Sequence, residues 1–498
     1  MRSLNLAAAA LLSVVSLSQC ASDANITKPL SSRQILPSNF KPPQVFENVN
    51  LLRNINLEKS YPRETINVVI ENKDAEPQDE YYLPFEAGTI DSVGGLEVRD
   101  KKDAGKGLFK VEVVEYDPSS STQFYLIRLP EPLAPSAQQT LSITYSLLSS
   151  LSPIPAKISQ MDKQFLRYTF SAYAPSAYST KKQKTKVKFP TTDIPDYTVL
   201  PSTSSGEDPQ RQGSTFTYGP YDSLPAGASE LVTVRYEFTK PVLYVSLLER
   251  DLEISHWGGN LATEERYWLV NHAAELSSQF NRVAWQSTQY YNPPTAALRE
   301  LNFPLRPGAQ DPYFTDDIGN VSTSRWRSNS REAKLELKPR YPVFGGWKYS
   351  FRVGWNAELS RYLRRLSNGE SYVLKVPVLE GPKQAEGIEY EKAVIRVILP
   401  EGATNINYET SLPITSAEKT LHKTFMDTLG RSTLTLTAAN IVDEFRDRDL
   451  IVTYDYPFLA AFRKPLTITV GLFSVFVTVW ALGKLDVSIG RKRKAVVS

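Results

Sequence analysis

The chain has 498 residues, of which 41% are hydrophobic and 11% aromatic, and its formal net charge at pH 7 is only +3. This composition is typical of chains that fold around packed cores and argues against a disordered stalk, and the small net charge argues against a nucleic-acid partner. The only cysteine is Cys20. An internal disulfide is therefore excluded, and ordinary hydrophobic cores must stabilise the fold.

The first residues have the order of a secretory signal peptide. Arg2 supplies an early positive charge, an apolar run follows over residues 4–17, and small residues stand near Cys20. A bacterial lipoprotein signal ending at Cys20 is the alternative, but such a signal prefers a small residue where Gln19 stands. We predict a signal peptide over residues 1–20 and a chain that enters the secretory pathway.

Most of the chain between residues 21 and 464 is predicted to form β-strands. Short segments rich in β-branched and aromatic residues alternate with turn-forming clusters, which predicts a mainly β fold. The segment 264–275 fits either a helix or a strand, and its imperfect alternation favours a strand. The clearest predicted strands are 65–70, 111–114, 124–128, 140–145 and 232–238.

Three lysines, Lys184, Lys186 and Lys188, alternate along one predicted strand and therefore share a face. The simpler interpretation is a solvated edge strand, because lysines on an edge discourage aggregation. The alternative is a docking face for anionic lipid headgroups or for an acidic subunit.

Two short motifs occur twice in the same order. Residues 186–190 resemble residues 396–400, and residues 234–238 resemble residues 452–456, so the separations are 210 residues (186 to 396) and 218 residues (234 to 452). Similar separations suggest a tandem duplication of one β-rich domain. We predict a first β domain over residues 21–240 and a second over residues 241–464, with the boundary near Lys240-Pro241.

Few groups in the sequence could support metal chemistry. The chain has three histidines and contains neither an His-Glu-x-x-His motif nor a Gly-x-Ser-x-Gly motif. His272 and Glu275 lack an obvious further ligand, so an ordinary strand histidine is favoured over a metal site. Asp311, Asp316 and Asp317 fit no EF-hand spacing, and a solvated loop is favoured over a calcium site.

The segment Asp447-Arg448-Asp449 has the D-x-D spacing by which many glycosyltransferases hold a metal and a sugar diphosphate. Such short matches are common, and arginines flank this one just before a predicted strand, so a charged turn is the simpler interpretation. We predict no catalytic residue, no metal and no cofactor.

Two N-glycosylation sequons begin at Asn25 and Asn320. Asn25 lies very close to the predicted cleavage point. Asn320 is therefore the stronger candidate for a glycan.

Residues 465–483 carry no charge and lie between Lys464 and Lys484. A helix of this length, at about 1.5 Å per residue, spans about 28 Å, close to the roughly 30 Å of a bilayer core. The basic tail, residues 484–498, indicates a cytosolic C-terminus by the positive-inside rule. We predict a single-pass type I membrane protein.

One side of this predicted helix carries only small residues. Thr467, Gly471, Ser474, Thr478 and Ala481 recur at spacings of 4, 3, 4 and 3, which places them on one stripe. Small residues let helix backbones approach closely in lipid. We predict that this face packs against a membrane helix of another subunit; a chance arrangement is the alternative.

Several longer segments together resemble one known family. They are residues 46–51, 63–72, 254–258 (Ile-Ser-His-Trp-Gly), 317–324, 344–348 (Phe-Gly-Gly-Trp-Lys), 399–403 and 427–431, followed by Leu485-Asp486. These segments closely resemble the ribophorin I family, in order, from about residue 46 into the tail. The chain departs from the family at an extra Gly259 and in its short tail, which looks fungal and puts in doubt a ribosome contact through a long cytosolic domain.

The resemblance implies a function that belongs to a complex. Ribophorin I is a subunit of the oligosaccharyltransferase of the endoplasmic-reticulum membrane, which moves a preassembled oligosaccharide from dolichyl diphosphate to the asparagine of Asn-X-Ser/Thr. It implies two tandem lumenal domains, each resembling the noncatalytic N-terminal β domain of zinc aminopeptidases, and catalytic groups in a different, multi-spanning subunit. The expected role is to stabilise the complex and to present nascent polypeptides, with the translocon as a further expected partner.

Two other classes of function stay open at this point. One is a membrane-tethered hydrolase or glycosyltransferase that uses Asp447 and Asp449 or His272. The other is a cell-surface adhesion receptor with two β domains.

Overall fold

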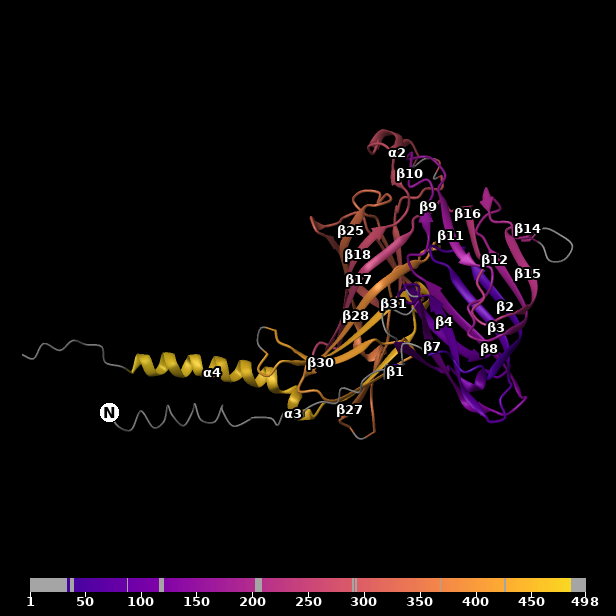
Figure 1. Ribbon diagram of the computed structural model, residues 1–498. Helices are drawn as coiled ribbons and strands as arrows, with labels where there is room; N and C mark the ends of the chain where they lie inside the picture. Colours follow the sequence, from indigo (N-terminus) through magenta and orange to yellow (C-terminus); the bar gives the residue numbers. More distant parts are fainter. Residues whose placement is uncertain are drawn as a thin grey trace, which may run out of the picture.

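The computed structural model describes residues 34–35 and 40–484, apart from residues 87, 116–120, 202–207, 289–290, 292, 368 and 425–426. The predicted signal peptide, the sequon at Asn25 and the tail from residue 485 lie outside these residues. The described chain is mainly β and ends in one long apolar helix, which confirms the predicted fold class. In Figure 1 the first half of the chain (indigo to magenta) lies beside the second half (pink to yellow), and helix α4 projects from the second half.

The first half is built on one large sheet. All five of the clearest predicted strands form, and the long apolar–polar alternation of β2 and β3 appears as alternating buried and exposed side chains. Within the described residues the order of the large sheet is β14 (Gln210–Gln212), β15 (Thr215–Leu224), β12 (Thr180–Lys188), β2 (Phe46–Asn56), β3 (Arg63–Asn72), β8 (Gln138–Leu147) and β5 (Val93–Asp100).

Two smaller sheets complete the first half. One has the order β1 (Gln34–Ile35), β6 (Lys110–Glu115), β7 (Thr122–Leu133) and β4 (Gln78–Glu86). The other has the order β13 (Asp196–Tyr197), β16 (Leu231–Glu237), β11 (Phe165–Ser171) and β9 (Ser152–Pro153). Short 3-10 turns, η1 (Ile90–Ser92) and η2 (Ala104–Lys106), lie on either side of β5.

The second half repeats this plan. Its large sheet has, in the described residues, the order β22 (Gly319–Asn320), β21 (Ala309–Asp316), β25 (Lys348–Glu358), β18 (Asn260–Asn271), β17 (Leu243–Ser255), β28 (Ile388–Glu401), β31 (Arg431–Val442) and β30 (Ser416–His422). The ambiguous segment 264–275 falls largely in β18, so the predicted strand is confirmed.

The smaller elements of the second half follow the same plan. One small sheet has the order β20 (Leu301–Leu305), β24 (Ala333–Leu337) and β23 (Arg325–Ser328), and the other the order β26 (Leu363–Arg365), β27 (Ser371–Pro377), β32 (Asp449–Asp455) and β29 (Thr404–Thr410). The short strands β10 (Lys157–Ile158) and β19 (Glu275–Leu276) pair across the two halves. The remaining elements are η3 (Leu359–Arg361), η4 (Asp443–Phe445), α2 (Arg282–Thr288), α3 (Phe458–Ala461) and α4 (Arg463–Gly483).

The two motif pairs found in the sequence fall on matching strands. Residues 186 and 396 lie in β12 and β28, each of which pairs in parallel with the first long strand of its own half, β2 and β17 respectively. Residues 234 and 452 lie in β16 and β32. β16 pairs antiparallel with β11, the strand that precedes β12 in the chain, and β32 pairs antiparallel with β27, the strand that precedes β28. The pairing pattern therefore follows the duplication that the motifs suggest.

The buried side chains form two large clusters. One gathers mainly residues 46–242 and the other mainly residues 243–460. A few residues cross over: Tyr61 and Leu148 pack in the second cluster, and Ala273 and Ala274 pack in the first. The proposed boundary at 240/241 lies beside this division, and the crossing residues interlock the two halves.

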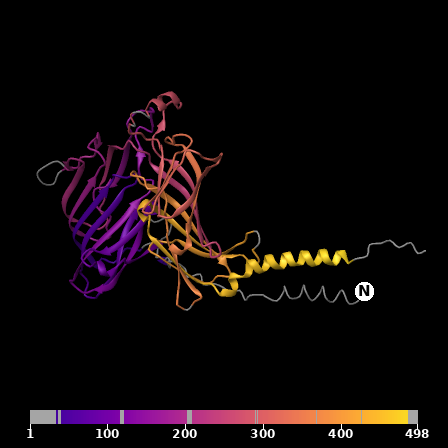
Figure 2. The same cartoon turned by 180° about the vertical axis from the view of Figure 1, so that it is seen from behind.

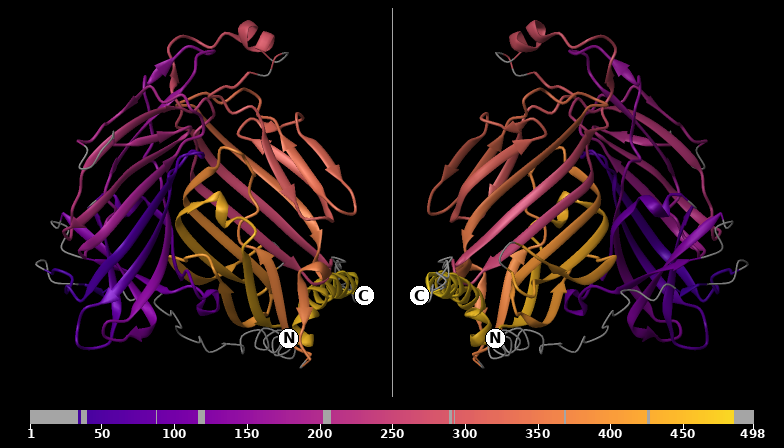
Figure 3. Two further views of the ribbon diagram at one scale, coloured as in Figure 1. Left: turned by 90° about the vertical axis from the view of Figure 1, so that its right-hand side faces the viewer. Right: turned by 90° about the vertical axis from the view of Figure 1, so that its left-hand side faces the viewer.

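Contacts between the halves are polar as well as apolar. Tyr61 donates a hydrogen bond to Asp443 (2.5 Å), and Lys59 pairs with the same carboxylate at 3.2 Å. Glu389, which is 2% exposed, accepts a hydrogen bond from the backbone N–H of Ser149 at 2.8 Å. Seen from behind in Figure 2 and from both sides in Figure 3, the two halves lean against each other, and α2 lies at the end of the molecule far from α3 and α4.

Candidate functional site

The aspartates of the D-x-D motif are held by cations. Asp449 Oδ2 lies 2.8 Å from Lys375 Nζ, and its other oxygen lies 3.7 Å from Arg306. Asp447 lies in the turn after η4 with a φ of 65° and pairs with Arg446 at 2.9 Å. These contacts fit the charged turn that the sequence favoured.

His272 and Glu275 point to different partners. The His272 ring stacks on Tyr244 with 4.5 Å between ring centroids, and Glu275 pairs with Lys157 at 3.4 Å. Among the described residues, no group of three or more His, Cys, Asp or Glu side chains is placed to hold a metal ion.

The acidic loop is organised around one buried carboxylate. Asp316 accepts hydrogen bonds from Arg340 Nε at 2.5 Å and from the backbone N–H groups of Ile318 and Gly319. Burial alone would raise the pKa of Asp316, but these donors hold it below its ordinary value. Asp316 thus closes the turn between β21 and β22, while Asp317 is exposed.

The lysines of β12 do not lie on an edge strand. β12 pairs with β15 on one side and with β2 on the other, so the solvated-edge interpretation was wrong. Lys186 and Lys188 are exposed and Lys184 is half-buried, and Lys188 pairs with Glu58 at 2.9 Å. Sequence patterns around one strand do not reveal its neighbours in the sheet. The docking face remains a proposal.

Asn320 occupies the exposed hairpin of β21 and β22. Its backbone carbonyl accepts a hydrogen bond from Arg340, so the turn is fixed while the side chain is exposed. An acceptor asparagine in such a turn is accessible to a modifying enzyme.

Helix α4 carries the predicted small stripe on a fully exposed surface. The first three residues of the helix are half-buried, and every residue from Leu466 to Gly483 is exposed. Thr467, Ser474 and Thr478 donate hydroxyl hydrogen bonds to carbonyls three or four residues earlier, so these hydroxyl groups are satisfied within the helix. A Cβ added at Gly471 would meet no atom within 4 Å. The stripe therefore presents a smooth face, and what packs against it remains a proposal.

The start of α4 is fastened to the second β domain. Lys464 Nζ lies 2.8 Å from Asp427, whose side chain is fully buried and also pairs with Arg431 at 3.5 Å. Burial by itself would raise the pKa of Asp427, but Lys464, Thr424 and Arg431 hold it well below its ordinary value. The sequence did not predict this junction, because Asp427 and Lys464 meet only through the hairpin of β30 and β31.

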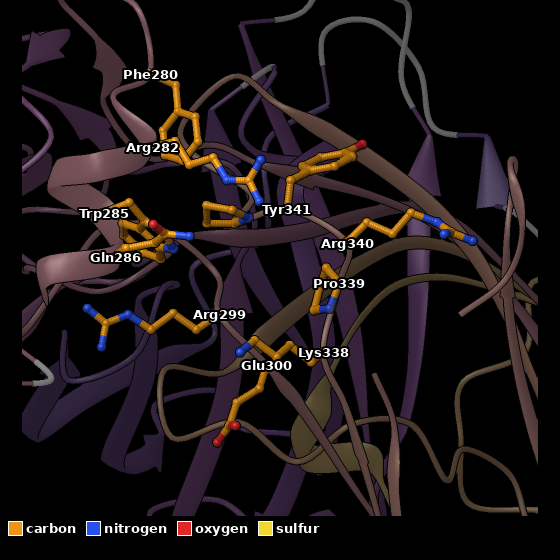
Figure 4. Close-up of a pocket in the computed structure, with 11 residues that line it drawn as sticks. Phe280, Arg282, Trp285, Gln286, Arg299, Glu300, Lys338, Pro339, Arg340 and Tyr341 are labelled. Carbon is orange, nitrogen blue, oxygen red and sulfur yellow. The ribbon is translucent and has the colours of Figure 1, made fainter. Parts of the chain in front are cut away.

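A cleft of about 910 Å³ lies beside α2 (Figure 4). Helix α2 is at the end of the molecule far from α4 (Figure 1). Phe280 and Trp285 line the cleft and pack on the buried Phe344, at 5.6 and 5.3 Å between ring centroids. Arg299 lies 5.1 Å from the ring centroid of Trp285.

The charge of the cleft lining is mainly positive. Arg282 and Lys338 are exposed, while Arg340 is already bonded to Asp316. Glu300 is the one acidic side chain among the residues that line the cleft in the described chain: Phe280, Arg282, Trp285, Gln286, Arg299, Glu300, Lys338, Pro339, Arg340, Tyr341 and Pro342. Aromatic rings with exposed cations favour an extended segment that carries apolar and anionic groups. The sequence did not single out this cleft, because its residues come from three separate segments.

A family model described as Ribophorin I matches residues 46–483. A protein of Schizosaccharomyces pombe named dolichyl-diphosphooligosaccharide–protein glycosyltransferase subunit 1 is 32% identical over 428 residues, which cover 86% of this chain and 92% of that protein. A protein of the same name from Caenorhabditis elegans is 34% identical over 391 residues, which cover 78% of this chain and 64% of that protein. The Arabidopsis thaliana protein named dolichyl-diphosphooligosaccharide–protein glycosyltransferase subunit 1B is 30% identical over 464 residues, which cover 91% of this chain and 96% of that protein.

Among solved structures, yeast LTA4 hydrolase aligns with a TM-score of 0.25 at 10% identity, over 39% of this chain and 29% of that chain. A two-domain M1 zinc metallopeptidase aligns with a TM-score of 0.23 at 11% identity, over 43% of this chain and 49% of that chain. At such scores the alignments say nothing about activity.

Proposed function

The chain belongs to the ribophorin I family, and on this premise we propose that it is a noncatalytic subunit of the oligosaccharyltransferase complex in the endoplasmic-reticulum membrane. The complex transfers a preassembled oligosaccharide from dolichyl diphosphate to asparagine in Asn-X-Ser/Thr. The names of the relatives favour this function over a separate hydrolase or an adhesion receptor.

The noncatalytic role is supported mainly by one observation: the two aspartates of the D-x-D motif form ion pairs with basic side chains. Asp449 pairs with Lys375 and Arg306, and Asp447 pairs with Arg446. A carboxylate that must hold a metal or move a proton needs a free coordination position, whereas both oxygens of Asp449 and one oxygen of Asp447 face cations.

The test uses both the complex and the isolated β domains. We expect the complex assembled with Asp449→Asn to keep its transfer activity, because Asp449 forms surface ion pairs worth at most about 1 kcal/mol. We expect residues 21–464 alone neither to transfer nor to hydrolyse lipid-linked oligosaccharide. An intact Asp449→Asn complex that has lost turnover would overturn the noncatalytic assignment.

We further propose the orientation and the partners. The two β domains lie in the lumen and the basic tail lies in the cytosol, as the positive-inside rule predicts. The proposed partner of the small stripe is a membrane helix of another subunit, and the catalytic multi-spanning subunit is one candidate. The stripe consists of Thr467, Gly471, Ser474, Thr478 and Ala481. The face of Lys184, Lys186 and Lys188 is proposed to dock an acidic subunit or anionic lipid headgroups, and the translocon is a proposed neighbour.

Nascent polypeptide is the proposed ligand of the cleft beside α2. The exposed cations Arg282 and Lys338 and the aromatic side chains of the cleft provide contacts that do not depend on one sequence. A photo-crosslinkable acceptor peptide should label this cleft in the complex, and the double variant Arg282→Glu with Lys338→Glu should lower labelling severalfold. Lys419→Glu, at an exposed lysine on β30, is the matched control. Equal labelling of the double variant and the control would remove the cleft from the proposal.

A further inference from the structure

Large apolar side chains are exposed around the point where α4 begins. They are Phe458 (72% exposed), Leu459 (80%) and Phe462 (45%) in and after α3, Trp257 (67%) in the turn between β17 and β18, and Leu429 (53%) in the hairpin loop between β30 and β31. We call these five residues the collar. Single exposed apolar residues are normal on a protein surface, but a contiguous group marks an interaction site.

Three segments that are distant in sequence carry the collar to the start of α4, where the loop of Leu429 is joined through the ion pair of Asp427 with Lys464. Trp257 donates an indole hydrogen bond to the carbonyl of Ala461 at 2.6 Å, which ties the β17–β18 turn to α3. The Phe458 and Phe462 rings lie 4.9 Å apart. Figure 1 shows α3 and the loop after β30 at the same end of α4.

The collar is fixed relative to the membrane helix. The backbone N–H of Leu429 donates a hydrogen bond to Glu401 at 2.6 Å, and the nearby Asp427 pairs with Lys464 in the first turn of α4. A Cβ added at Gly402 would lie 2.9 Å from the Cβ of Ala460, so α3 also packs closely on the second domain. The collar and the first turn of α4 therefore keep one geometry.

The lipid surface is the occupant that this position favours. α4 has 21 residues, and at about 1.5 Å per residue it is as long as the bilayer core is thick, so its first turn lies where the core begins. Phe462 immediately precedes Arg463 and Lys464, which places aromatic rings and cations together at that level. Aromatic and basic side chains are enriched at membrane interfaces, because the headgroup region accommodates both an apolar body and a charge.

We propose that the collar inserts into the headgroup region of the bilayer leaflet at the N-terminal end of α4, so that the second β domain rests on the membrane in a fixed orientation. The collar then adds a second membrane contact to the helix. The position of the first domain, which leans against the second, follows from this contact.

The chain is well suited to a direct test, because Cys20 is its only cysteine. Cys20 ends the predicted signal peptide, so in the mature chain single cysteines at Leu459→Cys and Leu429→Cys would carry an environment-sensitive fluorophore. Val283→Cys on α2 and Ile318→Cys in the β21–β22 turn are matched controls, since their native side chains are 78% and 77% exposed. The labelled chain is measured in the complete complex, reconstituted in nanodiscs of phosphatidylcholine with or without brominated acyl chains.

We expect brominated lipid to quench the labels at positions 459 and 429 at least threefold more than the labels at 283 and 318. Equal quenching at all four positions would overturn the proposal. Labels at 459 and 429 that are shielded from both lipid and a water-soluble quencher would also overturn it, because another subunit would then cover the collar.

Discussion

Arg53 in the first β domain and Arg250 in the second occupy matching positions in the two large sheets. Arg53 lies opposite Thr185 on the parallel strand β12, and Arg250 lies opposite Ile395 on β28. Thr185 and Ile395 are separated by the same 210 residues (185 to 395) as the repeated motif. Both arginines are buried, and the carboxylates that neutralise them are placed differently.

In the first domain the buried arginine pairs with a single carboxylate. Arg53 donates two hydrogen bonds to Glu64, at 2.9 and 2.8 Å, and Glu64 also accepts hydroxyl hydrogen bonds from Tyr145 and Tyr168. A bidentate pair with both oxygens further bonded is the arrangement in which buried charges are best compensated.

In the second domain two carboxylates share one arginine. Arg250 bonds to Glu265 and to Glu380, the latter at 2.8 Å, and Tyr267 donates to Glu265. Burial raises the pKa of Glu265, and the neighbouring Glu380 adds to this shift. Glu265 lies directly across from Arg250, whereas Glu64 lies across from Ile55, two residues beyond Arg53.

The difference shows what this fold requires of its sequence. A shift of two residues along a strand keeps a side chain on the same face, so either placement brings the carboxylate to the arginine. In each half a buried arginine of the large sheet is thus neutralised by a carboxylate, and the position of that carboxylate on the neighbouring strand differs by two residues. The second domain differs further by carrying the cleft, the exposed sequon and the membrane junction.

The largest effect is expected from removing the arginine of the second domain. Arg250→Met leaves Glu265 and Glu380 buried without a cation, and we expect it to lower the free energy of unfolding by about 3–5 kcal/mol. Arg53→Met should cost less, because two tyrosines still donate to Glu64. Urea unfolding of residues 21–464 measures both variants.

The control for this comparison is Arg352→Met. Arg352 forms a partly exposed pair with Glu264 at 3.1 Å, so its loss should cost at most about 1 kcal/mol. If Arg250→Met were no worse than Arg352→Met, the buried cluster would not be what stabilises the second domain.

The contact between the domains should depend on pH through Glu389. Burial raises the pKa of Glu389 to about 8 from an ordinary value of 4.5, so the folded protein keeps this proton where the unfolded chain releases it. Stability is therefore lost as pH rises from about 4.5 to about 8, by up to about 1.4 kcal/mol per pH unit. Glu389→Gln, which stays neutral, should flatten this slope in unfolding measured at pH 5 and pH 8.

Glu391→Gln provides the matched control, because Glu391 is exposed on the same strand. Its slope should equal that of the wild type. The same slope in Glu389→Gln and the wild type would mean that Glu389 does not link the domains to pH.

Substitutions in α4, the helix that follows the second domain, are expected to have a smaller effect, which is confined to assembly of the complex. Gly471→Leu adds bulk within the small stripe, and we expect insertion and the folding of the β domains to be kept while co-purification of the complex falls severalfold. Phe473→Leu, off the stripe, should change little. Recovery of the complex with Gly471→Leu at the wild-type level would remove the argument for this face.

The smallest effect on the fold is expected at Asn320. Its side chain is exposed, so Asn320→Gln should change the free energy of unfolding by less than about 0.5 kcal/mol. Glycosidase treatment should shift the gel mobility of the wild-type protein and leave the variant unchanged. A variant whose mobility and glycan content match the wild type would show that Asn320 carries no glycan.

Local pattern was enough for much of the fold. Alternating burial in β3 and β18 follows directly from alternating apolar residues, and an uncharged stretch of 19 residues predicted α4. The repeated motifs at 186 and 396 suggested a tandem duplication, and both lie in strands that pair in parallel with the first long strand of their own half. Local pattern failed for β12, whose lysines resemble those of an edge strand although the strand has a neighbour on each side.

The sequence by itself thus determined the β class and the long apolar helix at the C-terminal end, since each depends on periodicity or composition within a short window. Only the tertiary structure decided which buried charges meet, how α4 is fastened and where apolar residues gather around it. Asp427 reaches Lys464, and Trp257 reaches Ala461, only after hairpins far apart in the chain have packed together. Contacts of this kind depend on the register and packing of whole sheets, which no local window of sequence contains.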